Sequence, residues 1–464
     1  MKPEYKKYIL DNVQKRSVQQ IAEDLNLKER TIRWFLEEKG INPVSSSPLH
    51  VSPFVRNGII VLSALVITSI FISAFISIRN HVLVADEIVF NLIINKALEY
   101  NLDLLRFFKE YNNMLASMFP TYFLTIAFVA KTLHVTSYPS FRLISFVLNM
   151  IVSIGFILAA IKVEHENGNK RIWQFFLFPL IFPFYFLIYT DVSSLGFVIL
   201  SAALTLRRRF FWSAFFGAIA VLFRQNNVIW IMLFYLILYG EENGLKISIS
   251  SILRHVIKGW MYLLIVISFI IFVYLNKGIA MGLKEMHPGA SLYVGNVYFA
   301  LFTFFFAFLP IHIYNFSSVV RLIKKIKGLL PLFALFLIYW FFFKNNHPWN
   351  GPDRVYYFRN KILCYFINGS IIKKFLFFLP MAYSFLSLIV TPLEKKVYCL
   401  LYPFTLIFLI TLWLIESRYY IVPFVLFLLF RKRQHIALEY SLILYFAALS
   451  FLVYQKINYT PFFL

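Results

Sequence analysis

The sequence predicts an all-α polytopic membrane protein with a small helical module at its front. The 464-residue chain is 60% hydrophobic and 14% charged, and its mean hydropathy is +0.71, whereas a soluble domain is about half apolar and about a quarter charged. From Gly58 onward, apolar runs of roughly 17–25 residues recur, which is the length of a transmembrane helix. Residues 1–56 contain no such run, so we do not expect a signal peptide there.

The front of the chain predicts a separate unit. Residues 1–40 fit a helix-turn-helix-like cytoplasmic module, residues 41–56 are rich in Pro and Ser and fit a linker, and residues 57–464 form the membrane domain. In "SVQQIAEDLNLKERTIRWFLEE", apolar residues follow a helical period on both sides of Asn26, where a tight turn is expected. The positions expected on inner faces are Ile21, Ala22, Leu25, Leu27, Ile32, Phe35 and Leu36.

Two interpretations of this module stay open. A helix that begins near Lys28 would turn Lys28, Arg30 and Arg33 outward, where a recognition helix needs cations for nucleic acid. Glu29, Glu37 and Glu38 dilute that charge, which favours a helical hairpin with a solvated face. Nucleic acid is therefore the weaker candidate partner.

The membrane domain is expected to contain about 12–13 transmembrane helices. The net charge of +23 fits basic cytoplasmic loops beside anionic lipid headgroups. The expected spans are residues 57–78, 118–134, 139–161, 172–189, 191–206, 210–239, 253–276, 294–316, 329–343, 372–390, 397–413, 415–430 and 437–454. The clusters expected on the cytoplasmic side are Arg207-Arg208-Arg209, Lys324-Lys325-Lys327 and Arg431-Lys432-Arg433.

These clusters and the cytoplasmic front module fix the expected topology. They place residues 79–117 on the outer side, together with residues 189–192. If all three spans proposed between residues 118 and 189 crossed the membrane, residues 189–192 would lie on the cytoplasmic side and not on the outer side. One of those segments is therefore expected to be re-entrant or to lie along the membrane interface.

The first outer segment contains adjacent carboxylates, Asp86 and Glu87, in "HVLVADEIVFN". An acid directly after a transmembrane span can serve as a general base at the membrane surface, although ordinary solvation of a loop is the alternative. The segment continues through "ALEYNLDLLRFFKEYNN", an amphipathic stretch suited to the membrane interface.

Polar residues also interrupt two apolar runs. Asp191 follows "FYFLIYT" and either caps the next helix or is an acid kept for function at the membrane edge. "LFRQNNVIW" carries Arg224, Gln225, Asn226 and Asn227. An arginine at the membrane centre costs roughly 2.5–3.5 kcal/mol, so it should face an anion, and its planar fork suits phosphate. The alternative is polar contact between helices.

Three later segments add candidate ligands for an anion. They lie in "MGLKEMHPGASLY", in "KNNHPWNGPDRVYYFRNK" and in "LIESRYYIVP". Cations that converge on the outer side would suit the phosphate of a membrane lipid. The candidates are Lys284 and His287 in the first segment, His347, Asp353, Arg354 and Arg359 in the second, and Glu416 and Arg418 in the third.

Several of these motifs resemble one family of C-type glycosyltransferases. They are the polytopic alpha-1,2-glucosyltransferases that use dolichyl-phosphate glucose to add the last glucose of the lipid-linked N-glycan precursor. The motifs that match are Tyr189-Thr190-Asp191-Val192, Arg224-Gln225-Asn226-Asn227-Val228-Ile229-Trp230 and Asp86-Glu87-Ile88, with looser matches at His347-Pro348, Asp353-Arg354-Val355-Tyr356 and Ser417-Arg418-Tyr419-Tyr420.

The resemblance departs from the family pattern at several places. Asn226 stands where the family has Thr, and the loop around Lys284 and His287 lacks the family's Asp. The family's His and Pro-Gln after the acidic pair are absent as well. The resemblance is specific in the middle of the chain and loose in the substrate loops, so it carries the chemistry better than it carries the identity of the sugar.

The resemblance implies the transfer of a hexose, with glucose as the favoured sugar, from a polyprenyl-phosphate donor to a lipid-linked glycan or another acceptor on the outer face. The transfer would invert the configuration of the sugar. Asp86 would deprotonate the acceptor hydroxyl, and Glu87 would orient the acceptor or share that role. Arg224 and Arg418, with Lys284 and Arg354, would hold the leaving phosphate. No cofactor is required because fixed cations stabilise the developing charge. A divalent ion bound by the two adjacent carboxylates stays an alternative.

Two other classes remain as alternatives. A flippase or transporter of lipid-linked sugars would also need buried cations, but it should show internal repeats. A membrane-tethered DNA-binding regulator would explain residues 1–40 but not the membrane domain. The front module favours a prokaryotic source and hence the plasma membrane, whereas a eukaryotic chain would belong to the endoplasmic reticulum membrane.

Overall fold

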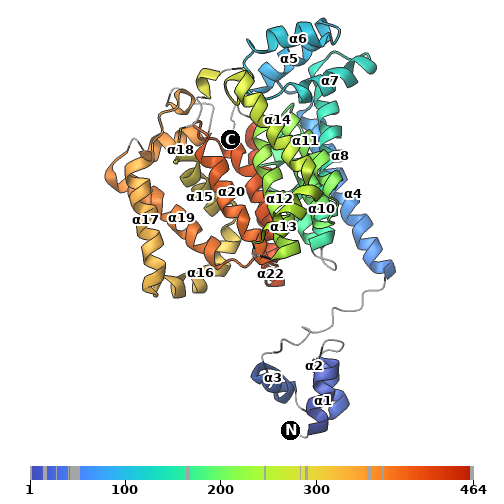
Figure 1. Ribbon diagram of the computed structural model, residues 1–464, viewed down its shortest axis with the longest axis vertical. Helices are drawn as coiled ribbons and strands as arrows, with labels where there is room; N and C mark the ends of the chain where they lie inside the picture. Colours follow the sequence, from blue (N-terminus) through green and yellow to red (C-terminus); the bar gives the residue numbers. More distant parts are fainter. Residues whose placement is uncertain are drawn as a thin grey trace. The chain divides into compact units, whose positions relative to one another are not determined.

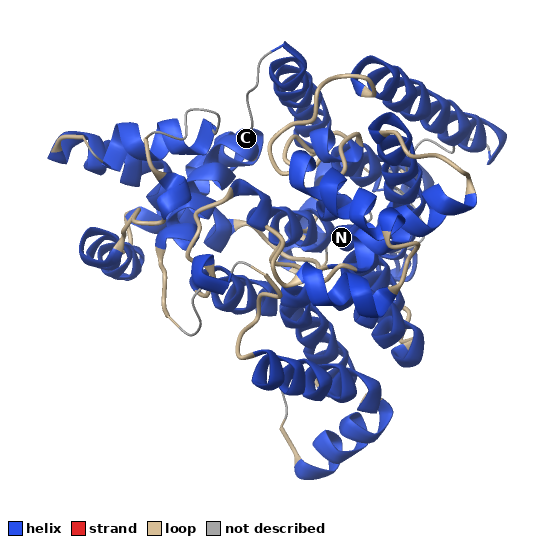
Figure 2. Cartoon of the chain, turned by 90° about the horizontal axis from the view of Figure 1, so that it is seen from above, coloured by secondary structure: helices blue, strands red, loops and turns tan. Residues whose placement is uncertain are grey.

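The chain is described from a computed structural model. The described residues are 3–13, 18–27, 29–39, 41, 53–163, 168–244, 247–282, 284–287, 291–352, 358–367 and 369–459. Across these residues the secondary structure is helical, with a single isolated bridge between Leu393 and Arg431 and no strand (Figure 2). Contacts divide the chain into two units, Met1–Phe71 and Ile72–Leu464, which we treat separately.

The first unit begins with three short helices around a small apolar core. They are α1 (Pro3–Asn12), α2 (Val18–Leu25) and α3 (Glu29–Glu38), and Asn26 takes the left-handed conformation, with φ of +48°, between α2 and α3. The buried core residues are Ile9, Val13, Val18, Ile21, Ala22, Ile32, Phe35 and Leu36, with Leu25 and Leu27 packed against them.

This burial confirms the inner faces expected from the sequence. Arg30 is exposed, as expected of a solvated or ligand-binding face. Lys28 and the side chain of Arg33 lie outside the described residues. The helix-turn-helix assignment therefore stays a prediction, and so do the boundaries of the module and its linker.

Helix α4 runs from the first unit into the second. The second unit is a helical bundle with irregular segments at one end (Figure 1). Its helices are α4 (Pro53–Ile78), α5 (Glu87–Glu99), α6 (Leu104–Tyr111), α7 (Thr121–Thr132), α8 (Tyr138–Val163), α9 (Gly168–Phe176), α10 (Thr190–Leu206), α11 (Phe210–Phe223), α12 (Val228–Asn243), α13 (Ile249–Lys258), α14 (Trp260–Asn276), α15 (Gly295–Ala307), α16 (Leu309–Ile323), α17 (Ile326–Phe342), α18 (Phe358–Ile367), α19 (Ile371–Val390), α20 (Leu401–Ile410), α21 (Ile421–Phe430) and α22 (Ile436–Tyr459). We call the end of the bundle that carries α5 and α6 the outer end.

Apolar helices of several lengths make up the bundle. Among the described residues, three helices are long and apolar enough to cross a membrane, namely α8, α19 and residues 436–457 of α22. Two bent pairs meet the same test together: α13 with α14, bent by 79°, and α15 with α16, bent by 99°. Shorter apolar helices cover most of the other expected spans, so the chain is an integral membrane protein.

The segment expected to span at residues 118–134 does not cross the bundle. Just before α7, the Phe119 amide donates to Oε1 of Gln225 (3.3 Å). Near its other end, the Lys131 ammonium donates to the carbonyl of Asn101 (3.1 Å), between α5 and α6. The 12 residues of α7 extend about 18 Å, short of the roughly 30 Å of hydrocarbon. α7 is thus the segment that lies on the outer side, which removes the disagreement in parity.

The span expected at residues 210–239 is two helices. α11 and α12 lie side by side (Figure 1), and they are joined by Arg224 and the 3-10 turn Gln225–Asn227. The Arg224 backbone is extended, with φ of −148° and ψ of 113°. Arg224 therefore lies at a helix junction at the outer end and not in the middle of a span.

The span expected at residues 172–189 is mostly irregular. After α9 it contains only the 3-10 turn Phe182–Tyr185. Asn149 donates to the carbonyls of Phe184 and Tyr185 (both 3.2 Å), and Ser145 donates to that of Leu187 (3.0 Å). Non-helical backbone is tolerated at membrane depth when protein groups satisfy it, and α8 supplies those groups here.

At the opposite end, one member of an expected basic cluster is buried. Arg431 is 1% exposed and donates through Nη1 to Oε1 of Glu439 (2.8 Å) and through Nη2 to Oε1 of Gln174 (2.9 Å). Its charge therefore joins α9, α21 and α22 instead of facing lipid headgroups.

Candidate active site

Asp86 lies at the outer end, directly before the first residue of α5. Its carboxylate forms an ion pair with Arg418 (Oδ2 to Nη2, 2.8 Å) and its side chain is 38% exposed, against 11% for Arg418. The Asp86 amide donates to the hydroxyl of Tyr189 (3.1 Å), and the Arg418 guanidinium lies over the Tyr189 ring at 5.3 Å. The predicted base thus meets a predicted phosphate ligand from 332 residues further along the chain.

Glu87 is placed quite differently from its neighbour. It is completely buried and forms a bidentate ion pair with Arg142 of α8, with Nε to Oε1 at 3.0 Å and Nη2 to Oε2 at 2.6 Å. It also accepts hydrogen bonds from the amides of Ile188 (2.8 Å) and Val84 (3.0 Å). Four bonds occupy both oxygens, so the expected contact between Glu87 and an acceptor does not fit this geometry.

A small polar hollow lies beside the Asp86–Arg418 pair. Asp191, in the first turn of α10, accepts a bond from Nη1 of Arg224 (2.8 Å), and its carboxylate is nearly fully buried. Space for water in the hollow is about 20 Å³, enough for about one water molecule. The lining residues are Asp191, Ser194, Arg224, Asn226, Asn227, Phe408, Arg418, Tyr419, Ile421 and Val422.

The polar run 224–227 divides into two kinds of residue. Gln225 is buried and donates to the carbonyls of Ser117 (2.7 Å) and Ile279 (2.9 Å), so it joins two outer segments. Asn227 is buried and donates to Oγ of Ser194 (2.6 Å) and to the Ala220 carbonyl (2.8 Å), which closes the end of α11. Arg224 and Asn226 are only partly buried. They can meet a ligand, whereas Gln225 and Asn227 hold the backbone.

The two asparagines give a test of this division. Asn227→Ala removes two buried hydrogen bonds and should destabilise the protein by about 1–3 kcal/mol, measured as a lower midpoint of thermal unfolding in detergent. Asn226→Ala should leave that midpoint unchanged and raise the KM for a substrate that enters the hollow. Equal losses of stability in both variants would contradict the assignment.

A chain of alternating charges leads away from Asp86. Glu416 is completely buried and lies between Arg418 (3.4 Å) and Arg359, with which it forms a close ion pair. Arg359, at the start of α18, is 3% exposed. The order is carboxylate, guanidinium, carboxylate, guanidinium, so each buried charge meets an opposite one.

The remaining predicted residues form a second group or are not described. Lys284 donates to the Asn276 carbonyl (2.6 Å) and is exposed. His347 contacts the Met286 carbonyl (3.4 Å) and the Trp413 ring (4.5 Å), and nearby His287 helps to lower the pKa of His347. None of the three lines the hollow. Asp353 and Arg354 lie outside the described residues.

His347 should make stability depend on pH. Burial lowers the pKa of His347 from 6.5 to about 4, with smaller contributions from His287 and Arg359. The unfolded chain therefore binds more protons between pH 6.5 and pH 4, so stability should fall as the pH is lowered through this window. Unfolding midpoints in detergent should drop over this range, and His347→Gln should flatten the drop. Identical slopes in both proteins would contradict this assignment.

Metal ligands do not gather in the described part of the chain: it holds no group of three or more His, Cys, Asp and Glu side chains that could bind a metal ion. Sequence reasoning missed Arg142, and it named Glu416 and Arg359 without predicting the ion pair between them. A lone arginine in the apolar run "SYPSFRLISF" was the available signal for Arg142, because such a cation needs a partner.

Comparison with known proteins places the chain in a family. The model of the DIE2/ALG10 family matches residues 94–244 and 243–429. Relatives named "Dol-P-Glc:Glc(2)Man(9)GlcNAc(2)-PP-Dol alpha-1,2-glucosyltransferase" occur in Candida albicans (30% identical over 63% of this chain and 71% of that protein), Arabidopsis thaliana (25%, over 54% and 64%) and Homo sapiens (24%, over 60% and 69%). No solved structure matches significantly. Because the family model covers most of its length, the chain belongs to the DIE2/ALG10 family.

Proposed function

We propose that the chain is a membrane glucosyltransferase that moves glucose from a polyprenyl-phosphate donor, dolichyl-phosphate glucose in the named relatives, to the terminal sugar of a lipid-linked glycan. The observation that carries the proposal is the Asp86–Arg418 ion pair at the edge of the hollow that contains Arg224. This arrangement brings a carboxylate and two guanidinium groups, the groups that an inverting transfer from a lipid phosphate needs, to one place. Family membership supports the same chemistry.

The reaction follows from these groups. The acceptor hydroxyl attacks C1 of the donor glucose from the face opposite the phosphate, Asp86 takes the hydroxyl proton, and the bond between C1 and the phosphate oxygen breaks. The electron pair stays on the phosphate, whose growing negative charge meets Arg418 and Arg224. Attack opposite the leaving group inverts the configuration at C1.

The closed site has to open before this reaction. The hollow has about 20 Å³ of space, which cannot hold a phosphate and a sugar. In addition, the Asp86 carboxylate is engaged in its ion pair with Arg418. An arriving phosphate would replace Asp86 as the partner of Arg418. The same exchange would free the Asp86 carboxylate to accept a proton, so donor binding prepares the base.

In this proposal Glu87 positions the base, and the front module takes no part in the reaction. We assign Glu87 to positioning Asp86, because its bonds to Arg142 and Ile188 fix the start of α5 against α8 and the segment before α10. Residues 1–40 remain a helix-turn-helix-like module outside the reaction. The named relatives come from eukaryotes, which supports the endoplasmic reticulum membrane over the plasma membrane.

A donor assay tests the function. Purified protein in detergent is incubated with a lipid-linked glycan acceptor and, in turn, with polyprenyl-phosphate glucose, mannose and arabinose, with and without EDTA. We expect consumption of the glucose donor only, a product with an α linkage, and no loss of rate in EDTA. Consumption of another donor would change the sugar, and consumption of none would reject the proposal.

A further inference from the structure

A large apolar cavity lies next to the chain of charges. It has a volume of about 880 Å³ and is lined mainly by Phe, Leu and Pro side chains of α15, α18, α19 and α22. This is the size range of cavities that bind small organic ligands. Half-exposed side chains such as Phe306 (48%) and Leu379 (47%) lie along it. We call it the α15–α19 cavity.

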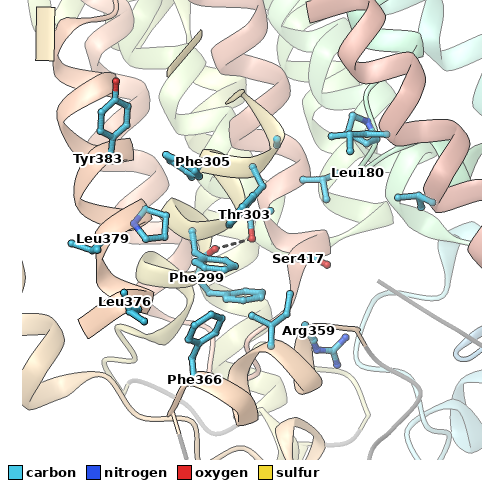
Figure 3. Close-up of a pocket in the computed structure, with 18 residues that line it drawn as sticks. Leu180, Phe299, Thr303, Phe305, Arg359, Phe366, Leu376, Leu379, Tyr383 and Ser417 are labelled. Carbon is cyan, nitrogen blue, oxygen red and sulfur yellow. Dashed lines mark hydrogen bonds between the residues drawn. The ribbon is translucent and has the colours of Figure 1, made fainter. Parts of the chain in front are cut away.

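One end of the α15–α19 cavity is polar. In Figure 3, Arg359 lies at the end opposite Tyr383, and Ser417 lies on the wall beside it. Arg359 forms an ion pair with Glu416, which in turn contacts Arg418. The cavity therefore has an apolar body and a cationic end that leads directly to the proposed phosphate ligand.

An apolar cavity with a cation at one end fits a lipid with an anionic head. We propose that the α15–α19 cavity holds the isoprenoid chain of the glycosyl donor, with Arg359 beside the phosphate. This inference rests on the proposed function and names where that substrate lies.

The donor fits this place better than the acceptor. The bond that breaks joins glucose directly to the donor phosphate, so the donor chain must begin within reach of Arg418. In the relatives' printed name, the acceptor carries its lipid beyond a whole glycan. The acceptor lipid is therefore far from the reacting hydroxyl, and the chain that leaves the site at Arg418 is that of the donor.

A second apolar cavity provides a control. It has a volume of about 580 Å³, lies between α15, α17, α19, α20 and α21, and its described lining carries no charged side chain. α19 borders both cavities: Leu379 lines the α15–α19 cavity, and Ile389 lines the second one. Both side chains are about half exposed (47% and 54%), so Trp can replace either of them at similar cost to folding.

The two tryptophan variants are compared with two donors. Leu379→Trp narrows the α15–α19 cavity and should raise the KM for a full-length polyprenyl-phosphate glucose about tenfold, while the KM for the short citronellyl-phosphate glucose changes little. Ile389→Trp should change neither value. Equal effects on both donors, or equal effects of both variants, would overturn the inference.

A binding measurement keeps this result separate from the assay of function. A photoactivatable polyprenyl phosphate without sugar is crosslinked to wild-type protein, and the labelled peptides are identified by mass spectrometry. We expect labels in α18 and α22, which border the α15–α19 cavity but not the second one, and unlabelled polyprenyl phosphate should displace them whereas phosphatidylglycerol should not. Absence of labels from α18 and α22, or displacement by both lipids, would reject the site even if glucose transfer is observed. Labels in α18 and α22 without glucose transfer would reject the proposed function alone.

Discussion

Asp86→Asn should reduce glucose transfer by about 10²–10⁴-fold, the range that a positioned general base contributes. The amide cannot accept the hydroxyl proton, although it keeps the shape of the side chain. Arg418 keeps its contact with Glu416 (3.4 Å) and remains able to meet the donor phosphate. The loss should therefore appear in kcat, while the KM for the donor stays within a few-fold of wild type.

A matched control exists in the same outer segment. Asp103 caps α6 by accepting bonds from the amides of Leu105 (3.0 Å) and Arg106 (3.2 Å). Asp103→Asn removes one carboxylate from the same outer segment and should leave transfer nearly unchanged. If Asp86→Asn turns over at the wild-type rate, Asp86 is not the base.

Glu87→Gln should have the largest effect on stability. Glu87 and Arg142 are both completely buried, and removal of one partner leaves the other charge without compensation, at a cost of about 3–5 kcal/mol. The Arg142 guanidinium also donates to backbone carbonyls at the end of α4, among them Ile78 (2.8 Å) and His81 (2.7 Å). The variant should unfold at a much lower temperature in detergent, with its activity lost in proportion to the unfolded fraction.

A double-mutant cycle separates the pair from its surroundings. Arg142→Met alone and Glu87→Gln alone should each destabilise strongly, and the double variant should lose much less than the two losses combined. Glu99→Gln, which breaks the solvent-exposed Lys96–Glu99 pair, should produce no measurable change. Simple additivity at Glu87 and Arg142 would show that the pair is not coupled.

The sequence predicted candidate residues for the site, and the structure brings four of them together: Asp86, Asp191, Arg224 and Arg418. Asp86 and Glu87 are neighbours in sequence, but successive residues of a helix point in different directions. Arg142, a partner 55 residues away, holds Glu87 completely buried, which leaves Asp86 as the exposed member of the pair. No local pattern contains that information, so the sequence pointed to both carboxylates but not to their different surroundings.

The apolar runs predicted the fold class but not the course of the chain over residues 118–134, 172–189 and 210–239. The composition of α7 resembles that of a spanning helix, and only its contacts with Asn101 and Gln225 reveal that it stays on the outer side. The run 210–239 is apolar on both sides of Arg224, so four polar residues were interpreted as an interruption within one helix. Hydropathy averages over about 19 residues and cannot distinguish an interruption from a reversal of direction.

The charged side chains of the candidate active site balance one another. Arg224, Arg359 and Arg418 are matched by Asp86, Asp191 and Glu416. In the proposed transfer, the lipid phosphate would gain one negative charge as glucose leaves, and the proton taken by Asp86 would remove one from the protein. The total charge of the enclosed region stays constant through the step. The spent lipid is then held by an excess of one cation, so its departure should be tied to the return of the proton from Asp86 to water.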